Sequence, residues 1–411
     1  MTEKRSMDTT REFAGKHCVL IIENEAVPFD RRMWNIAHAL QEAGAAVSVI
    51  CPIFGKDSER FTVLDGIRIH RYKNTFADGS VLGYFREYGV AFVKTVVLLH
   101  KLMLRGRIHV VHAANPPDIF WPLALYLKLF RIRFIFDEHD LSPEAYLSRF
   151  DKDEKSAGML YTAQRWFQRL SYRFADGILS TNETYRARAI QTDPRNAAKT
   201  FVVRNGPDTR TFRSCPPNAA LKKGRRYLAA YIGVMAIQDG VEYVIRAVDE
   251  LVNARKVRDI MFYLIGKGDD WPRLKEMAAE RGLAEDIVFT GRIPDAEALE
   301  ILSTADVCLS PDPYSPLNEL STMTKIMEYM SLGKPIVSFH LKENTYSAGP
   351  SAVYVDNNNP VAFAEGILAL LHDPDRSRSM GEAGIRRVAE ALSWQKQAER
   401  LRAAYTYVLS R

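Results

Sequence analysis

Residues Ser321 to Ser338 read S-T-M-T-K-I-M-E-Y-M-S-L-G-K-P-I-V-S. In the first half, apolar side chains recur at helical spacing, at Met323, Ile326, Met327 and Met330. This spacing predicts an amphipathic helix, which Ser321 or Thr322 is suited to cap and Gly333 is suited to end. The apolar residues that follow predict a buried strand. A helix followed directly by a strand is the repeating unit of an α/β fold.

Short apolar runs alternate with longer amphipathic runs along the rest of the chain. The predicted strands are His17–Glu23, Ala46–Pro52, Ile67–Tyr72, His109–Ala114, Arg133–Asp137, Gly177–Asn182, Phe201–Asn205, Tyr227–Gly233, Asp259–Gly266, Ile287–Gly291, Asp306–Pro311, Pro335–Phe339 and Ala352–Val355. Most are followed by a helical pattern, such as Arg31–Ala43, which Gly44 ends. Because the strands are continuously apolar rather than alternating, we expect parallel, doubly wound sheets with helices on both faces.

The alternation is interrupted between residues 206 and 226, where three prolines and several charged residues indicate a linker. We therefore predict two Rossmann-like α/β domains, residues 17–208 and 227–385, joined by a linker at residues 209–226. A polar N-terminal segment, residues 1–16, precedes them. The C-terminal helices, residues 386–411, are expected to pack back toward the first domain.

Composition excludes several classes of protein. The chain has 411 residues, 26% of them charged, and a net charge of +6, which fits neither a collagen nor a disordered chain. Four cysteines without a C-x-x-C pair indicate neither a disulfide framework nor a zinc site. The N-terminus lacks the apolar core of a signal peptide, and charges interrupt the most apolar stretch, Val90–Leu104. We therefore expect a soluble cytoplasmic protein with no nucleic-acid partner.

Polar residues follow most of the predicted strands, where doubly wound sheets bind their ligands. They are Asn24-Glu25, Asn115, Glu138-His139-Asp140, Asn182-Glu183, Asn205 and Gly266-Lys267-Gly268. If the two domains face each other, these residues meet in one cleft. The glycines of the last group allow the backbone to approach a ligand.

Lys325 and Glu328 share one face of the helix in the opening stretch, because they are three residues apart. The beginning of a helix offers free N–H groups to an anion such as a diphosphate. Lys325 would add a positive charge there, and Glu328 could accept hydrogen bonds from ribose hydroxyls. Taken alone, the pair is better explained as an ion pair on the surface.

The stretch T-K-I-M-E-Y-M-S-L-G-K-P-I-V closely resembles the nucleotide-sugar segment of family 4 retaining glycosyltransferases, which have the GT-B fold. The similarity extends to four other segments: R-F-I-F-D-E-H-D-L-S-P-E (Arg133–Glu144), V-V-R-N-G-P-D (Val202–Asp208), F-T-G-R-I-P (Phe289–Pro294) and A-D-V-C-L-S-P (Ala305–Pro311). It covers about residues 17 to 408. The chain is thus identified as a member of this family.

The resemblance implies two facing domains, the first for the acceptor and the second for a nucleotide-diphosphate sugar. It implies transfer of a hexosyl or hexosaminyl group with retention to a glycan or lipid-linked acceptor, typically in bacterial polysaccharide or glycolipid assembly. His139 corresponds to a residue close to the reacting sugar. The expected donor-binding residues are Gly233, Gly266, Lys267, Ser321, Thr322, Lys325 and Glu328. Lys325 is also expected to act in catalysis, by neutralising the departing diphosphate, and no cofactor or obligatory metal is expected.

The sequence departs from the family pattern at two places. The family has a second glutamate eight positions before Glu328, where this chain has Leu320 flanked by Glu319. The loop after Gly233 usually carries an arginine and a lysine for the diphosphate, and here Val234 and Asp239 take their places. These departures favour one alternative, a non-catalytic nucleotide-sugar-binding protein. The other alternative is a nucleotide-sugar epimerase of the same fold.

Three further features have two interpretations each. Arg31 and Arg32 open a helix, although the helix dipole disfavours cations there. Either nearby acidic side chains compensate their charge, or the arginines, together with Asn115, contact a phosphate or the acceptor. Asp137 to Asp140 hold three carboxylates and a histidine, but neighbours on an extended segment point apart, which argues against a shared metal. The apolar and basic runs Val90–Arg107 and Phe120–Phe130 are either core helices or a contact with the inner face of a membrane.

Overall fold

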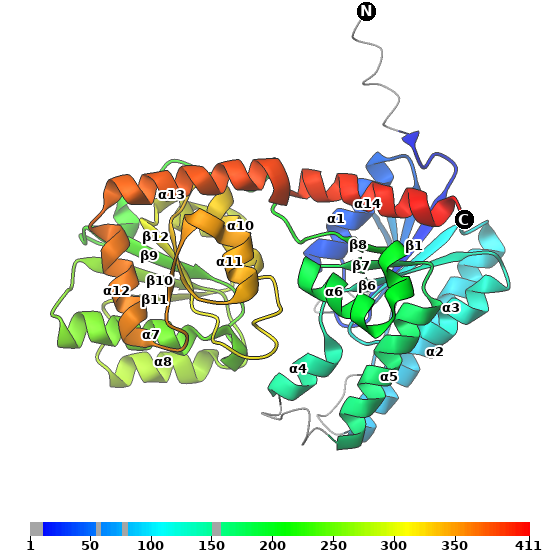
Figure 1. Ribbon diagram of the computed structural model, residues 1–411, viewed down its shortest axis with the longest axis horizontal. Helices are drawn as coiled ribbons and strands as arrows, with labels where there is room; N and C mark the ends of the chain where they lie inside the picture. The colour runs from blue at the N-terminus through cyan, green and yellow to red at the C-terminus, as the bar shows by residue number, and fades with distance from the viewer. Residues whose placement is uncertain (1–10, 55–58, 76–80, 150–157) are drawn as a thin grey trace, which may run out of the picture. The chain divides into compact units, whose positions relative to one another are not determined.

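The computed structural model describes residues 11–54, 59–75, 81–149 and 158–411; residues 1–10 of the predicted N-terminal segment lie outside this part (Figure 1). The chain divides into two compact units. The first comprises the residues up to Arg204 together with Gln397–Arg411, and the second comprises Asn205–Lys396. The boundary therefore falls before the predicted one, and the predicted linker belongs to the second unit. Of the C-terminal helices, only the last returns to the first unit.

The first unit is built on an eight-stranded sheet in the order β3-β4-β2-β1-β5-β6-β7-β8, parallel except for the β3–β4 pair. Its strands are β1 (His17–Ile21), β2 (Ala46–Pro52), β3 (Phe61–Leu64), β4 (Ile67–Tyr72), β5 (Val110–Ala114), β6 (Arg133–Glu138), β7 (Gly177–Ser180) and β8 (Thr200–Val202). Its helices are α1 (Arg31–Glu42), α2 (Val81–Arg105), α3 (Trp121–Lys128), α4 (Ser142–Arg149), α5 (Gly158–Phe174), α6 (Glu183–Thr192) and most of α14 (Trp394–Leu409). The sequence did not predict β3, because this exposed edge strand has no buried apolar run.

The second unit has a six-stranded, fully parallel sheet in the order β11-β10-β9-β12-β13-β14. Its strands are β9 (Tyr227–Ile232), β10 (Ile260–Ile265), β11 (Ile287–Gly291), β12 (Val307–Ser310), β13 (Ile336–Phe339) and β14 (Ala352–Val355). Its helices are α7 (Val241–Asp249), α8 (Trp271–Glu280), α9 (Asp295–Thr304), α10 (Thr324–Ser331), α11 (Lys342–Ala348), α12 (Pro360–Leu371) and α13 (Pro374–Arg387). Figure 1 draws this unit from green to orange.

Alternate side chains of β9 enter two different apolar clusters. Ala229 and Tyr231 face the cluster that contains residues of α7 and α12, whereas Leu228 and Ala230 face the one that contains residues of α9 and α10. Successive side chains of a strand point to opposite faces, so the sheet is covered by helices on both. This arrangement explains why the strands read as unbroken apolar runs.

The helix α10 lies where the sequence predicts it, but it begins differently. Met323 stands at the N-cap, and no side chain caps the helix there. Ser321 instead donates its hydroxyl to the carbonyl oxygen of Leu317 at 2.8 Å, so the predicted hydroxyl cap is wrong. The predicted end is found: Gly333 follows the helix with a φ of 68°, a conformation that glycine adopts at little cost.

Each sheet has a point where the order of strands along the chain reverses, between β1 and β5 in the first unit and between β9 and β12 in the second. Ligands of doubly wound folds bind at such switch points, beyond the carboxyl ends of the strands. Tyr329 of α10 bridges the second switch point. Its hydroxyl donates to the Leu309 carbonyl of β12 at 3.1 Å and accepts from the Ile232 N–H of β9 at 2.9 Å.

Candidate functional site

In the first unit, three side chains converge on Asp137 near the end of β6. Arg32 donates from Nη2 to Oδ1 at 2.6 Å and from Nε to Oδ2 at 3.0 Å. The Nε2 atoms of His112 and His139 lie 3.1 and 3.0 Å from the same Oδ2. Burial by itself would raise the pKa of Asp137, but the charges of Arg32 and His139 and the two histidine hydrogen bonds lower this pKa well below its usual value. Asp137 is therefore a buried, ionised anchor for His139.

The structure gives Arg32 a different role from the predicted contact with a phosphate or acceptor. Its side chain is buried, and besides Asp137 it binds the carbonyl oxygen of Val203 through Nη1 at 2.7 Å. The unfavourable charge at the start of α1 is thus compensated from inside the domain. Arg31, one position earlier on the helix, is exposed to solvent.

Asn115, which follows β5 at the first switch point, was predicted to touch the acceptor or a phosphate. Its side chain is fully buried and used within the protein. Its Oδ1 accepts from the backbone N–H groups of His139 at 2.7 Å and Asp140 at 3.2 Å. Its Nδ2 donates to Asp118 Oδ1 and to the Asp140 carbonyl, both at 2.8 Å. Asn115 therefore holds the turn that carries His139.

In the second unit, Lys325 lies at the switch point between β9 and β12. Its Nζ forms a buried ion pair with Asp312 Oδ1 at 2.5 Å and lies 5.2 Å from the centre of the Tyr231 ring. A Cβ placed on Gly233 would lie 3.2 Å from Lys325 Cε, so the ammonium group sits directly beneath the loop that follows β9. Lys325 thus occupies the predicted location, with Asp312 as an unpredicted partner.

Two further predicted donor-binding residues, Gly266 and Lys267, belong to the loop after β10, which meets the loop after β9. A Cβ on Gly266 would lie 1.9 Å from the Gly233 carbonyl oxygen, and one on Gly268 would lie 2.4 Å from that of Met235. The glycines are therefore required because two backbone loops meet there, which differs from the predicted approach to a ligand. Lys267 is exposed, with its Nζ 5.3 Å from the centre of the Trp271 ring.

The residues of α10 and of the segment before it that were predicted to contact the ribose and diphosphate are only partly accessible. Glu328, Ser321 and Thr322 are half-buried. Thr322 donates to Glu343 Oε2 of α11 at 3.4 Å. Ser321 and Thr322 belong to the segment that joins β12 to α10, and the Thr322 bond links this segment to the helix that follows β13.

Residues at or near the positions that depart from the family pattern belong to the loops around the switch point; one of them is Asn318, two residues before Leu320. Asn318 is buried and donates to the carbonyl oxygens of Gln238 at 2.9 Å and Pro313 at 2.8 Å, which joins the loops after β9 and β12. Asp239 accepts from the Ala236 N–H at 3.1 Å, and burial raises its pKa to about 6. The side chain of Val234 is 58% exposed. The loop after β9 therefore brings no cation of its own to this point.

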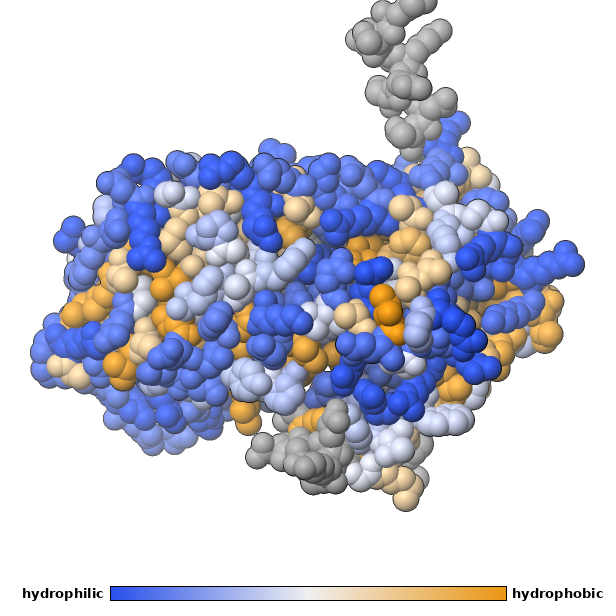
Figure 2. All heavy atoms as spheres, viewed as in Figure 1, coloured by the Kyte–Doolittle hydropathy of each residue, from blue (hydrophilic) through white to orange (hydrophobic). Residues whose placement is uncertain are grey.

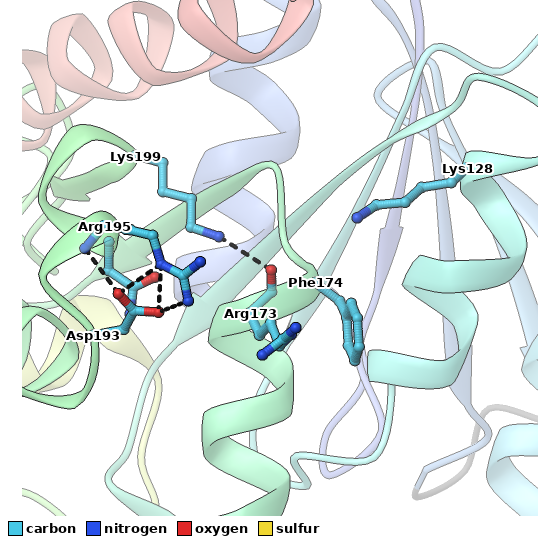
Figure 3. Close-up of a pocket in the computed structure, with 7 residues that line it drawn as sticks. Lys128, Arg173, Phe174, Asp193, Arg195 and Lys199 are labelled. Carbon is cyan, nitrogen blue, oxygen red and sulfur yellow. Dashed lines mark hydrogen bonds and ion pairs between the residues drawn. The ribbon is translucent and has the colours of Figure 1, made fainter.

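A surface cavity of about 310 Å³ lies elsewhere in the first unit. Figure 3 shows it between the ends of α3 and α5 and the turn before β8, lined by Lys128, Arg173, Phe174, Asp193, Arg195 and Lys199. Lys199 precedes β8 whereas His139 follows β6, so the cavity lies at the amino ends of the parallel strands and His139 at their carboxyl ends. Two of its four cations are already engaged: Lys199 donates to carbonyl oxygens at the end of α5, and Arg195 pairs with Asp193 at 2.6 Å.

Within the described ranges, no group of three or more histidine, cysteine, aspartate or glutamate side chains is arranged to hold a metal ion. Sequence reasoning missed Asp312 and Tyr329, although both stand in quoted motifs or next to them. The available signal for Asp312 was its place directly after a predicted strand, between two prolines.

Two family models match the chain. "Glycosyl transferase 4-like domain" matches residues 30–206, and "Glycosyl transferases group 1" matches residues 226–373. This chain belongs to the group 1 glycosyltransferases. The two matches correspond to the two α/β units, so the predicted membership of the group 1, family 4 type glycosyltransferases and the GT-B fold are confirmed.

Relatives of this glycosyltransferase are moderately similar in sequence. An α-maltose-1-phosphate synthase of Mycolicibacterium smegmatis is 26% identical over 68% of this chain and 74% of its own length. A GDP-mannose-dependent α-(1-6)-phosphatidylinositol monomannoside mannosyltransferase of the same organism is 28% identical, over 48% of this chain and 53% of its own length. These relatives support glycosyl transfer from a nucleotide sugar as the function of the chain.

Solved structures share the fold across nearly the whole chain. Sucrose-phosphate synthase from Thermosynechococcus elongatus superposes with a TM-score of 0.76 at 18% identity, covering 96% of this chain and 99% of its own. Anabaena HepE, solved in complex with UDP-glucose, gives 0.70 at 15% identity, covering 95% and 99%. At this level of identity the likeness concerns the fold alone.

Proposed function

We propose that this group 1 glycosyltransferase moves a hexosyl or hexosaminyl group from a nucleotide-diphosphate sugar to a glycan or lipid-linked acceptor, with retention, in bacterial polysaccharide or glycolipid assembly. The observation that carries the proposal is the constellation at the β9–β12 switch point, where Gly233, Lys325 and the start of α10 come together. Nucleotides bind α/β domains at such points. The names of the two relatives describe one enzyme that makes a sugar phosphate and one that uses GDP-mannose.

The leaving diphosphate is held by Lys325 and by the N–H groups at the start of α10, without an obligatory metal. A helix N-terminus favours an anion, and Lys325 lies in its first turn. The Asp312 carboxylate beside Lys325 reduces the net positive charge available. Lys325 therefore serves the diphosphate by shifting its ammonium group from Asp312 toward the phosphate oxygens as these become more negative.

His139 acts at the sugar. Its side chain is 14% exposed. Asp137 binds its Nε2 and Asn115 binds its backbone N–H, so the orientation of the ring is fixed before any substrate binds. A hydrogen bond or charge held in place in this way stabilises a developing oxocarbenium-like centre more than a mobile one does.

The anomeric proton coupling of the product, measured by NMR during the reaction, distinguishes retention from inversion.

A peripheral contact with an anionic membrane, at the inner face of the cytoplasmic membrane, accounts for the exposed end of α3 and α2. Leu129 and Leu104 are 78% and 77% exposed, and Phe130 is exposed beside Lys128 and Arg131. Figure 2 shows orange atoms along the right-hand margin, which belongs to the first unit. No helix of the described residues is long and apolar enough to cross a membrane. Basic and apolar side chains side by side favour an interfacial position.

The test is incubation with a panel of nucleotide sugars, with and without a membrane extract, while nucleotide release and labelled product are followed. Labelled product that requires the extract supports transfer to an acceptor. An epimer or free sugar without any acceptor would identify the epimerase, and binding without turnover would identify the binding protein. Activity is expected to survive EDTA; its loss on chelation and recovery with Mn²⁺ or Mg²⁺ would contradict the metal-free leaving group.

Glu328→Ala locates the donor independently of the acceptor. Loss of a charged hydrogen bond to ribose should weaken binding of the nucleotide diphosphate by about 1.5–3 kcal/mol. Isothermal titration calorimetry measures this change, with Glu276→Ala, an exposed position of α8, as the matched control. Equal affinities for the two folded variants would remove Glu328 from the site.

A further inference from the structure

Tyr405 connects the C-terminal helix with the group around Asp137. It lies on α14, and its hydroxyl is 2.7 Å from Nδ1 of His112, while Nε2 of the same ring is 3.1 Å from Asp137 Oδ2. All three side chains are completely buried. Sequence analysis assigned no role to Tyr405, because nothing in the local pattern of α14 distinguishes it from the other apolar positions of that helix.

The direction of these hydrogen bonds follows from the chemistry of the three groups. Asp137 is ionised and can only accept, so Nε2 of His112 must carry a proton. Burial lowers the pKa of His112, which keeps the ring neutral and leaves Nδ1 with a lone pair. Burial also raises the pKa of Tyr405, so its hydroxyl keeps the proton that it donates to Nδ1. The chain of donors therefore runs from Tyr405 through His112 to Asp137.

His139 depends on the same carboxylate oxygen. Asp137 Oδ2 accepts from His112, from His139 and from Arg32 Nε, at 3.1, 3.0 and 3.0 Å. Hydrogen bonds in a chain polarise one another, so a donor to His112 Nδ1 strengthens the bond from His112 Nε2 to Oδ2. The position and the charge of Oδ2, and with them the orientation of the His139 ring, are set partly by Tyr405.

We propose that Tyr405 is a positioning residue for His139, acting through His112 and Asp137. Its effect on catalysis rests on the proposed role of His139 at the sugar, but its effect on the histidine rings does not. In Tyr405→Phe, Nδ1 of His112 is left buried without a donor. The His112 bond to Oδ2 then weakens, and the His139 ring loses part of its alignment.

The experiment compares Tyr405→Phe with Tyr407→Phe. Both substitutions remove one tyrosine hydroxyl from α14, but the hydroxyl of Tyr407 has no hydrogen-bond partner among the described residues. Long-range ¹H–¹⁵N NMR spectra of histidine-labelled protein report the proton on each ring nitrogen. We expect the wild-type His112 as the Nε2–H form, with the ring signals of both His112 and His139 displaced in Tyr405→Phe and unchanged in Tyr407→Phe. His139→Ala and His112→Gln assign the two rings.

Kinetics provide the second readout. Loss of one neutral hydrogen bond should lower kcat about fivefold in Tyr405→Phe, while the donor KM stays within about twofold because the donor site is in the other unit. His112→Gln, whose amide can accept from Tyr405 and donate to Asp137, should retain more activity than His112→Leu.

Displaced His112 signals with unmoved His139 signals in Tyr405→Phe would overturn the proposal, because the coupling would then end at His112. A wild-type protein that transfers no sugar, but whose His139 signals respond to Tyr405→Phe, would instead contradict the proposed function and leave the positioning intact. If Tyr405→Phe does not fold, the comparison of His112→Gln with His112→Leu decides: equal kcat in the two would overturn the proposal.

Discussion

Arg31 and Arg32 show that one step along a helix decides whether a side chain is buried or exposed. The two arginines are neighbours at the start of α1, but they point to different sides of the helix. Arg32 shares the buried side of the helix with Met33 and Ile36, whereas Arg31 faces solvent. The presence of a compensating acid was predictable from the helix dipole. Its identity was not, because Asp137 lies on a strand more than a hundred residues away along the chain.

Arg32→Leu should destabilise the protein strongly, because it leaves Asp137 buried without its cation. Removing one partner of a buried ion pair costs about 3–5 kcal/mol, whereas Arg31→Leu should change the free energy of unfolding by less than about 0.5 kcal/mol. Urea unfolding followed by circular dichroism measures both. Similar midpoints for the two variants would show that the Arg32–Asp137 pair contributes little to stability.

His139→Ala should lower turnover about tenfold or more, the scale of a positioned proton donor or acceptor. Nucleotide affinity should be nearly unchanged, since the residue belongs to the first unit and the donor-binding residues to the second. Initial rates and calorimetric titration with the nucleotide diphosphate separate the two effects. Parallel losses of turnover and nucleotide affinity would argue against a role at the sugar.

At the scale of the element, α10 was predictable and its surroundings were not. Apolar spacing and Gly333 give the helix and its end. The hydroxyls of Ser321 and Thr322 were expected to cap the helix, but they bond Leu317 and Glu343 instead. The spacing of apolar residues along a helix does not predict such bonds. For the same reason Lys325 was placed correctly on the helix while its partner, thirteen residues earlier, was missed.

Lys325→Ala should reduce donor turnover more than Lys267→Ala, because Lys325 lies at the helix start and Lys267 is exposed. Steady-state rates over a range of donor concentrations measure this difference. Lys325→Ala also leaves Asp312 buried and unpaired, so Lys325→Met combined with Asp312→Asn is the control for stability. If the double variant is as stable and as active as the wild type, the diphosphate is held by another group.

At the scale of the molecule, the α/β class, the two domains and the order of elements followed from alternating runs along the chain. The return of the chain's end to the first unit was expected, but residues 386–396 stay with the second unit and only Gln397–Arg411 return, a division that depends on contacts between distant segments. Parallel sheets covered on both faces also bury polar groups that local patterns leave unassigned. Glu23, two residues beyond the end of β1, is one of them: it is 3% exposed and accepts from Asn74 Nδ2 at 2.9 Å.

Burial raises the pKa of Glu23 to about 7, more than the Asn74 hydrogen bond lowers it. The folded protein therefore binds this proton more tightly than the unfolded chain does, and the associated stability is lost as the pH rises from about 4.5 through 7. Glu23→Gln should remove that loss, raising stability at pH 8 by up to about 3 kcal/mol while changing little at pH 4.5.

Thermal unfolding at several pH values measures this effect, with Glu42→Gln, an exposed position of α1, as control. A wild type and a Glu23→Gln variant that lose stability in parallel between pH 5 and 8 would show that Glu23 is ionised in the folded protein without cost.

The two units are completed at different times during translation. The second unit is one continuous segment, and its last residue, Lys396, is synthesised before Tyr405 and the rest of α14. Domains generally fold as units while the chain is being made. The first unit, although its sheet is translated earliest, still lacks the helix that bonds His112 when its neighbour is complete. The half of the protein that begins first is therefore the half that finishes last.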